Sequence, residues 1–331
     1  MADNYWQGRS VLVTGAGGFV GSWVAQALVD RGAGVTLILR DEPATDNLHQ
    51  LGLQQRANVV RGSITDYPLV ERALNEYEAD TCFHLAAQAI VGAANQSPLS
   101  TFESNIRGTW TILEACRRTS VKRAVVASSD KAYGSQAALP YVEESPLLGT
   151  APYEVSKACT DLLARSYRMG FGLSVTVARC ANIYGGGDFN FSRLVPGTIR
   201  SVLAGERPII RSDGTPLRDY VYVDDAVDAY LRLGACPDEA AGVGAAFNFG
   251  SGEPVSALHL VRRITEVCGR PDLEPDVRGA GPGRNEIDCQ YVDSSRAEAV
   301  LGWSPRVPLE EGLHRSVHWY RQVLGQQKAA A

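Results

Sequence analysis

The sequence predicts an α/β protein, with a doubly wound parallel sheet followed by a smaller α/β unit. Strand and helix patterns alternate through residues 1–180, which is the pattern of a parallel sheet covered on both faces. A glycine-rich turn separates the first strand from the first helix, as in folds that bind dinucleotides. After residue 180 the alternation loosens into short strands and loops, and we expect the second unit there.

The first predicted strand, Val11–Thr14, ends at the segment GAGGFVG, and helical periodicity follows. Glycines in this context permit a tight turn, a close approach of the backbone to a pyrophosphate and close packing of helix on strand. The phosphates then lie at the helix N-terminus. The residues predicted to bind the dinucleotide here are Gly15, Gly18, Phe19, Val20 and Gly21.

The second predicted strand, Val35–Leu39, ends at two charged residues. Asp41 suits the ribose 2′-hydroxyl of NAD, whereas Arg40 suits the 2′-phosphate of NADP, and either residue is equally well explained as a solvated surface charge. A third short strand, Val59–Val60, leads to Ser63–Ile64, which we expect to flank the adenine.

The fourth predicted strand lies in the segment CFHLAAQ and ends in small residues. Ala86 and Ala87 leave room for a flat ring, although close packing against a helix explains them equally well. A helix from near Thr101 carries an apolar stripe that includes Phe102, Ile106 and Trp110. Because the carboxyl ends of parallel strands share one edge of the sheet, the glycine turn, the AAQ segment and the end of the next strand should meet there.

A proton-transfer cluster follows the fifth predicted strand, Arg123–Ser128. Ser129, Asp130 and Lys131 lie in its exit loop, and Tyr153 and Lys157 share one face of the next helix because they are four residues apart. A cation beside a phenol favours the phenolate and lowers the pKa of the phenol, which is ordinarily about 10. A Tyr and a Lys one turn apart also occur together by chance on many amphipathic helices.

The remainder of the chain opens with a sixth strand, Leu173–Ala178, and later contains the strand-turn-strand segment RPIIRSDGTPLRDYVYV. A further strand is predicted at Phe247–Phe249. Three arginines on loops or strand edges after residue 180 suit a diphosphate ligand, and each is also consistent with pairing to a nearby carboxylate. These arginines are Arg193, Arg218 and Arg284.

Composition argues against several classes of protein. The 331 residues carry a formal net charge of -5 without a basic run, so we expect neither a nucleic-acid nor a membrane partner. The 7 cysteines are scattered without metal-ligand spacing, which indicates reduced thiols and no metal site. The N-terminal segment MADNYWQGRS lacks an apolar signal region, and no stretch of ~18 apolar residues offers a membrane span. We expect a cytoplasmic protein.

The motifs TGAGGFVG, HLAAQ, NIRGT, YEVSK, ANIYGGGD, LRDYVYVDD and NFGSGEP together resemble the nucleotide-sugar epimerases and dehydratases of the extended short-chain dehydrogenase/reductase superfamily. The resemblance implies a Rossmann domain at residues 1–180, with a later strand contributed from about 215–250. It implies a mainly nucleotide-sugar-binding domain at 181–331. It also implies NAD as cofactor, with NADP as the alternative, and a homodimer that pairs the helices carrying Asn105 and Tyr153.

The same resemblance implies roles for individual residues. Tyr153 takes the proton of the sugar 4-hydroxyl, Lys157 holds the cofactor ribose and lowers the phenol pKa, and Ser129 hydrogen-bonds the same oxygen. Asn105 joins the cofactor site. The residues implied to bind the nucleotide-diphosphate sugar are Gln88, Asn182, Arg193, Arg218 and Arg284.

The segment SDKAY favours the 4,6-dehydratases within this family, and the likeness is to those acting on CDP-glucose. Elimination of water across carbons 5 and 6 needs an acid and a base. Asp130 matches the acid position, and Lys131 stands where the base is usually a Glu. LRDYVYVDD is the general form of its motif, which leaves the nucleotide and the sugar open. A 4-epimerase needs neither Asp130 nor Lys131 and is the alternative, and a non-catalytic dinucleotide-binding protein is a third.

Overall fold

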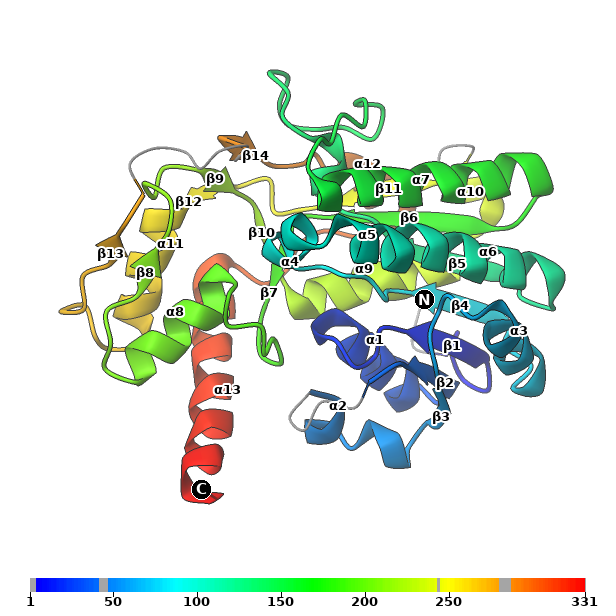
Figure 1. Ribbon diagram of the computed structural model, residues 1–331, viewed down its shortest axis with the longest axis horizontal. Coiled ribbons are helices and arrows are strands. Elements are labelled where there is room, and N and C mark those ends of the chain that lie inside the picture. The colour runs from blue at the N-terminus through cyan, green and yellow to red at the C-terminus, as the bar shows by residue number, and fades with distance from the viewer. Residues whose placement is uncertain (1–3, 42–46, 243–244, 280–286, 331) are drawn as a thin grey trace.

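The protein is organised around a seven-stranded parallel sheet of strand order β11-β6-β5-β4-β1-β2-β3 (Figure 1). The computed structural model describes residues 4–41, 47–242, 245–279 and 287–330. This sheet confirms the predicted doubly wound α/β class. Its strands are β1 (Ser10–Thr14), β2 (Gly34–Leu39), β3 (Asn58–Arg61), β4 (Thr81–His84), β5 (Arg123–Ala127), β6 (Val175–Cys180) and β11 (Ala246–Phe249).

Helices cover both faces of the sheet, because its strands are apolar on both sides. On β1, Val11 and Val13 belong to one buried cluster and Leu12 to another, as the alternation of side chains along a strand requires. The first cluster includes α1 (Phe19–Asp30) and α9 (Val223–Ala235), and the second includes α3 (Tyr67–Glu76), α6 (Gly108–Arg118) and α7 (Pro152–Phe171). Shorter segments are α2 (Asn47–Gln50), η1 (Leu53–Gln55), α4 (Val91–Gln96), α5 (Pro98–Phe102), the π-helical η2 (Glu103–Arg107) and η3 (Asp130–Tyr133).

The sixth predicted strand begins later than expected. The prediction was Leu173–Ala178, whereas β6 runs from Val175 to Cys180. Gly172 ends α7 in the left-handed conformation, and the Leu173 N–H donates to the carbonyl of Tyr167. The helix cap therefore occupies the residue that was assigned to the strand.

The chain after β6 builds a second packed region beside the sheet (Figure 1). Its core includes Ile199, Leu260, Ile264, Leu313 and Tyr320. The elements between β6 and the C-terminus, apart from α9 and β11, are β7 (Asn182–Tyr184), α8 (Leu194–Leu203), β8 (Ile209–Ile210), β9 (Leu217–Arg218), β10 (Tyr220–Tyr222), α10 (Asp238–Ala241), β12 (Val255–Ser256), α11 (Ala257–Val267), β13 (Asp276–Val277), β14 (Cys289–Gln290), α12 (Ser295–Leu301) and α13 (Leu309–Ala330).

The predicted strand-turn-strand segment does not form a hairpin. Its strands join three separate small sheets: β8 pairs with β13, β9 lies between β12 and β14, and β10 pairs with β7. The pairs β9–β14 and β10–β7 are parallel, so their partners come from distant parts of the sequence. This arrangement carries residues from 182, 218 and 290 to neighbouring positions.

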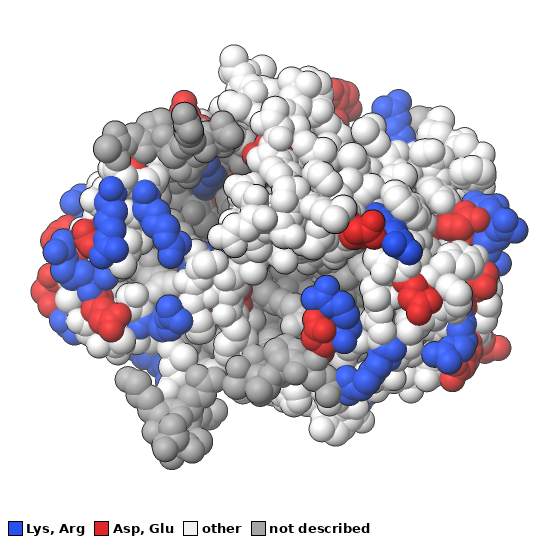
Figure 2. Space-filling model, viewed as in Figure 1, with Lys and Arg blue, Asp and Glu red and all other residues white. Residues whose placement is uncertain are grey.

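Within the described residues, no helix is both long and apolar enough to span a membrane, and no group of three or more His, Cys, Asp or Glu is arranged to hold a metal ion. All the cysteines are free thiols. On the face shown in Figure 2, Lys and Arg side chains are interspersed with Asp and Glu.

Candidate active site at the carboxyl edge of the sheet

The glycine turn after β1 lies so close to the end of β4 that side chains are excluded. Gly15 has φ +80°, and a Cβ there would lie 2.6 Å from the backbone nitrogen of Ala86. A Cβ on Gly21 would collide with the Gly15 carbonyl oxygen. Two of the predicted glycines are thus required by the turn itself, and Ala86 packs directly behind it.

The N-terminus of α1 is suited to an anion. Gly18 is the N-cap residue, no side chain caps the helix, and the first turn contains no acidic residue. The N–H groups of Phe19 and Val20 therefore belong to the set that an α-helix leaves without intrahelical partners. Together with the positive end of the helix dipole, they fit the pyrophosphate of a dinucleotide.

The residues predicted around the adenosine lie at the ends of β2 and β3. Asp41 forms an ion pair of 2.7 Å with Arg40, and both side chains are exposed. Exposed pairs of this kind contribute only about 0–1 kcal/mol, so the pair does not prevent Asp41 from accepting a ribose hydroxyl. Ser63 bonds to Thr65, and Ile64 is buried where Gly108 leaves room for it.

A buried histidine beneath the glycine turn was missed by the sequence analysis. His84, at the end of β4, lies 2.9 Å from Thr14 Oγ1 through Nδ1 and 3.1 Å from Thr109 Oγ1 through Nε2. Thr109 donates its own proton to the Asn105 carbonyl, so it accepts from His84 Nε2–H, and Nδ1 accepts from Thr14. Burial lowers the pKa of His84 to about 3, and the charge of Lys157 acts in the same direction.

Asn105 joins the loop after β4 to α7. It lies in the π-helical turn η2 and is 1% exposed. Its amide accepts from the Gln88 N–H at 2.7 Å, donates to the Gln88 carbonyl at 3.1 Å and donates to Ser156 Oγ at 2.9 Å. The Gln88 side chain, predicted to bind substrate, accepts from the N–H of Ile90. Ala87 is half-buried at the start of this loop.

Tyr153 and Lys157 share the inner face of α7, and both are buried. Lys157 Nζ donates to the Ala127 carbonyl at 2.6 Å and lies 6.0 Å from the centre of the Tyr153 ring. Burial raises the pKa of Tyr153 to about 12, while a hydrogen bond with Ser129 and the charge of Arg193 act in the opposite direction. That Lys157 lowers the phenol pKa stays a prediction, and in this structure the ammonium is turned toward the end of β5. Burial lowers the pKa of Lys157 to about 8.

The short helix η3 presents the segment that distinguishes the two predicted reactions. Ser129 caps it by accepting from the Lys131 N–H, and its hydroxyl donates to Asp130 Oδ1 at 3.0 Å. Asp130 is 1% exposed, and its Oδ2 has no hydrogen-bond partner among the described residues. The Lys131 ammonium lies 3.6 Å from Asp130 Oδ1 and donates to Asn182 Oδ1 at 3.1 Å. A buried carboxylate and an ammonium thus lie side by side near Tyr153.

The predicted arginines stand in different settings. Arg193, just before α8, forms an ion pair of 2.9 Å with Asp188 and is near enough to influence Tyr153. Arg218, in β9, donates to the Leu217 carbonyl. Arg284 lies outside the described residues.

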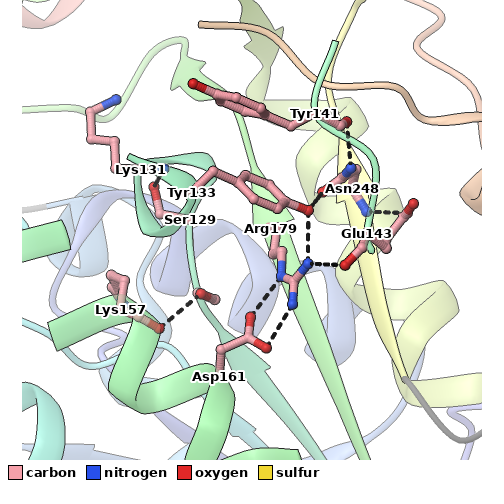
Figure 3. Close-up of polar contacts among 10 residues, drawn as sticks. Ser129, Lys131, Tyr133, Tyr141, Glu143, Lys157, Asp161, Arg179 and Asn248 are labelled. Atoms are coloured by element: carbon pink, nitrogen blue, oxygen red, sulfur yellow. Dashed lines mark hydrogen bonds and ion pairs between the residues drawn. The ribbon is translucent and has the colours of Figure 1, made fainter. Parts of the chain in front are cut away.

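A second buried polar network backs the site (Figure 3). Arg179 on β6 donates to both carboxylate oxygens of Asp161 on α7, at 2.7 and 2.8 Å. It also donates to the hydroxyl of Tyr133 in η3 at 2.8 Å, and Tyr133 in turn donates to Asn248 on β11 at 2.7 Å. Lys131 and Tyr133 point away from one another, Lys131 toward Asn182 and Tyr133 into this network (Figure 3). No local pattern in the sequence predicts this buried network.

The chain is similar to known proteins over nearly its whole length. A family model described as the NAD dependent epimerase/dehydratase family matches residues 11–250. A UDP-glucose 4-epimerase from Mycolicibacterium smegmatis is 34% identical over 94% of this chain and 98% of its own. A CDP-glucose 4,6-dehydratase from Salmonella typhimurium is 30% identical over 96% of this chain and 92% of its own.

The fold of this chain is also similar to that of a solved structure. The dTDP-glucose 4,6-dehydratase of Streptomyces venezuelae, crystallised with NAD, superposes with a TM-score of 0.86 at 28% identity, covering 97% of this chain and 99% of its own. The chain belongs to the NAD-dependent epimerase/dehydratase family.

Proposed function

We propose that this protein is a nucleotide-sugar 4,6-dehydratase that converts a CDP-glucose-like substrate to the 4-keto-6-deoxy sugar. The observation that carries the proposal is the buried carboxylate of Asp130, with one oxygen unpaired among the described residues, 3.6 Å from the ammonium of Lys131. Burying the Asp130 carboxylate is costly and gives a 4-epimerase no benefit, whereas elimination of water needs an acid and a base at this place.

NAD fits the glycine turn and the N-terminus of α1, and Asp41 and Lys157 would hold its two riboses. When bound, it would supply the acceptor for hydride from carbon 4 of the sugar and the donor of that hydride to carbon 6. Residues 1–180 with β11 form the cofactor side of the site in this proposal. Residues 181–331 mainly hold the nucleotide-diphosphate sugar.

Tyr153 serves the oxidation at carbon 4. As hydride leaves the carbon, Tyr153 in its phenolate form would receive the proton of the 4-hydroxyl and become the neutral phenol, and the Ser129 hydroxyl hydrogen-bonds the same oxygen. Burial raises the pKa of Tyr153 and so disfavours the phenolate, which is the proton-accepting form. The positive charges of Arg193 and of the bound cofactor would act in the opposite direction and favour it.

Asp130 and Lys131 serve the elimination. The ketone at carbon 4 makes the carbon 5 proton acidic, Lys131 removes that proton, and Asp130 protonates the 6-hydroxyl, which leaves as water. Transfer of one proton from the Lys131 ammonium to the Asp130 carboxylate turns the ion pair into a neutral base and a neutral acid.

The diphosphate of the substrate requires cations and donors at the edge of the second region. Arg193 and Arg218 supply the positive charge, and Asn182, the first residue of β7, accepts from Lys131. Gln88 and Arg284 complete the proposed set. The substrate enters where β7, β9 and β14 meet the carboxyl ends of β5 and β6.

A 4-epimerase is the alternative, and the 34% identity to a UDP-glucose 4-epimerase favours it. Ser129, Tyr153 and Lys157 serve that reaction equally well. In either case we propose a homodimer formed by α6 and α7, because Trp110, Leu162, Met169 and Phe171 are large apolar side chains exposed on these helices.

Mass spectrometry of the product separates the two reactions. The protein is incubated with NAD and with CDP-glucose, UDP-glucose or dTDP-glucose, and the sugar nucleotide is analysed for loss of one water. Loss of water is the expected result. A product of unchanged mass with an inverted carbon 4 contradicts the dehydratase and supports the epimerase.

A further inference from the structure

Gln290 reaches the dehydration pair from the far side of the active site. It lies in β14, it is fully buried, and its Nε2 donates to the backbone carbonyl of Asp130 at 2.9 Å. The two residues are 160 positions apart in the sequence. A side chain from the second region therefore holds the peptide that begins η3.

This contact closes a ring of polar contacts around Asp130 and Lys131. The N–H of Asp219 donates to the Gln290 carbonyl at 3.2 Å, and the Asp219 carbonyl accepts from Asn182 Nδ2 at 3.1 Å. Asn182 Oδ1 accepts from Lys131 Nζ at 3.1 Å, and Lys131 lies 3.6 Å from Asp130. Both members of the pair thus contact the second region, through Asn182 in β7, Gln290 in β14 and Asp219 between β9 and β10.

The ring is anchored at Asp219, which is fully buried. Its carboxylate accepts from the N–H of Ser251 at 2.9 Å and from the N–H of Gly252 at 3.2 Å. Two backbone donors hold a buried carboxylate firmly, because moving it would leave charge unpaired. Gln290 therefore connects Asp130 to a rigid point.

We propose that Gln290 is a positioning residue for the elimination step, acting through the Asp130 peptide. This inference rests on the proposed dehydratase function. Among the described residues, the hydrogen bonds of Gln290 reach Asp130 and Asp219, whereas Tyr153 and Lys157 are held by Ser129 and by β5. Loss of Gln290 should therefore misplace the acid and the base of the elimination and leave the oxidation at carbon 4 intact.

The test uses Gln290→Met, which keeps the length and removes the donor. Single-turnover reactions with the sugar nucleotide record reduced nicotinamide by its absorbance and dehydrated product by mass. We expect reduced nicotinamide to form at the wild-type rate and product to form about 10- to 100-fold more slowly, because small displacements of reacting groups cost that much. Thr265→Val, a change in α11 that also removes a buried hydroxyl, should leave both rates unchanged.

Gln290→Glu tests the positioning role through the pH dependence of the product rate, which a purely structural role of Gln290 would not change. A carboxyl group donates to the Asp130 carbonyl only when it is protonated. The product rate of this variant, divided by that of the wild type at the same pH, should rise as the pH falls, whereas the ratio for Gln290→Met should stay flat.

The outcomes separate the two proposals. If the wild type releases dehydrated product and Gln290→Met matches its product rate, the positioning role is wrong and the dehydratase stands. If Gln290→Met slows both steps equally, the role in elimination is also wrong. A wild-type product of unchanged mass overturns the dehydratase, and the inference with it.

Discussion

Arg179 on β6 and Asp161 on α7 form a bidentate ion pair, with both side chains less than one tenth exposed at 7% and 8%. Since Arg179 also binds the hydroxyl of Tyr133, the same guanidinium holds α7, which carries Tyr153, and η3, which carries Asp130. The two halves of the proposed chemistry are therefore kept in register by a residue outside the reacting set.

Breaking this pair should be more damaging than replacing it. Arg179→Met leaves the Asp161 carboxylate buried and unpaired, and we expect a loss of about 3–5 kcal/mol in the free energy of unfolding. Adding Asp161→Leu removes the stranded charge, so the double variant should recover part of the loss. Urea denaturation measures the wild type, Arg179→Met, Asp161→Leu and the double variant. A double variant as unstable as the sum of the two single changes would contradict the direct pairing.

His84 should make the protein sensitive to acid. Its pKa in the folded protein is about 3 against an ordinary value of 6.5, so below pH 6.5 the unfolded chain takes up a proton that the folded chain does not. The stability due to neutral His84 is therefore complete above pH 6.5 and is lost as the pH falls toward 3. Compared with His84→Gln, the wild type should lose about 1.4 kcal/mol per pH unit below pH 6.5 in denaturant titrations. Equal pH profiles for the two proteins would refute this.

Neighbouring glycines in the phosphate turn should differ sharply. Gly15→Ala places a Cβ 2.6 Å from the Ala86 nitrogen at φ +80°, and we expect a loss of roughly 2–4 kcal/mol. Gly17→Ala is the matched control, because the nearest atom to its Cβ is a Leu39 methyl at 3.9 Å. Thermal unfolding compares the two variants, and similar melting temperatures would show that the turn adapts.

Asp130→Asn should block the elimination of water without blocking the oxidation at carbon 4. The amide cannot donate the proton that the departing 6-hydroxyl requires, so reduced nicotinamide should accumulate while product formation falls by about 10²–10⁴-fold. Tyr153→Phe should instead abolish the reduction of the nicotinamide as well. Stopped-flow absorbance distinguishes these patterns. Full dehydration by Asp130→Asn would remove that residue from the mechanism.

The sequence was informative wherever function depends on local spacing. The glycine turn, the end of β4 and the Tyr153–Lys157 helix each form from a single strand–helix unit, and a parallel sheet necessarily brings such units to one edge. Strand existence was predictable for the same reason, because buried parallel strands are short apolar runs. The start of β6 is displaced by the helix cap at Gly172, and its end lies at Cys180, beyond the predicted Ala178.

What could not be predicted depends on contacts between distant segments. Gln290 lies in a two-residue strand and meets Asp130 only because β14 joins β9. The π turn that turns Asn105 inward leaves no mark in hydrophobic periodicity. The direction of the Lys157 ammonium could not be predicted either. Lys157 and Tyr153 share a helix face, but this does not decide whether the ammonium turns to the phenol or to the carbonyl of Ala127.

Strand β11 lies outside β6 at the end of the main sheet, although it is encoded long after the other strands. Until residues 246–249 have left the ribosome, β6 is an edge strand whose outer N–H and C=O groups are unpaired, and such edges recruit strands from other chains. Completion of the sheet is therefore delayed during synthesis. A truncated chain that ends before Ala246 should aggregate rather than yield a working cofactor half.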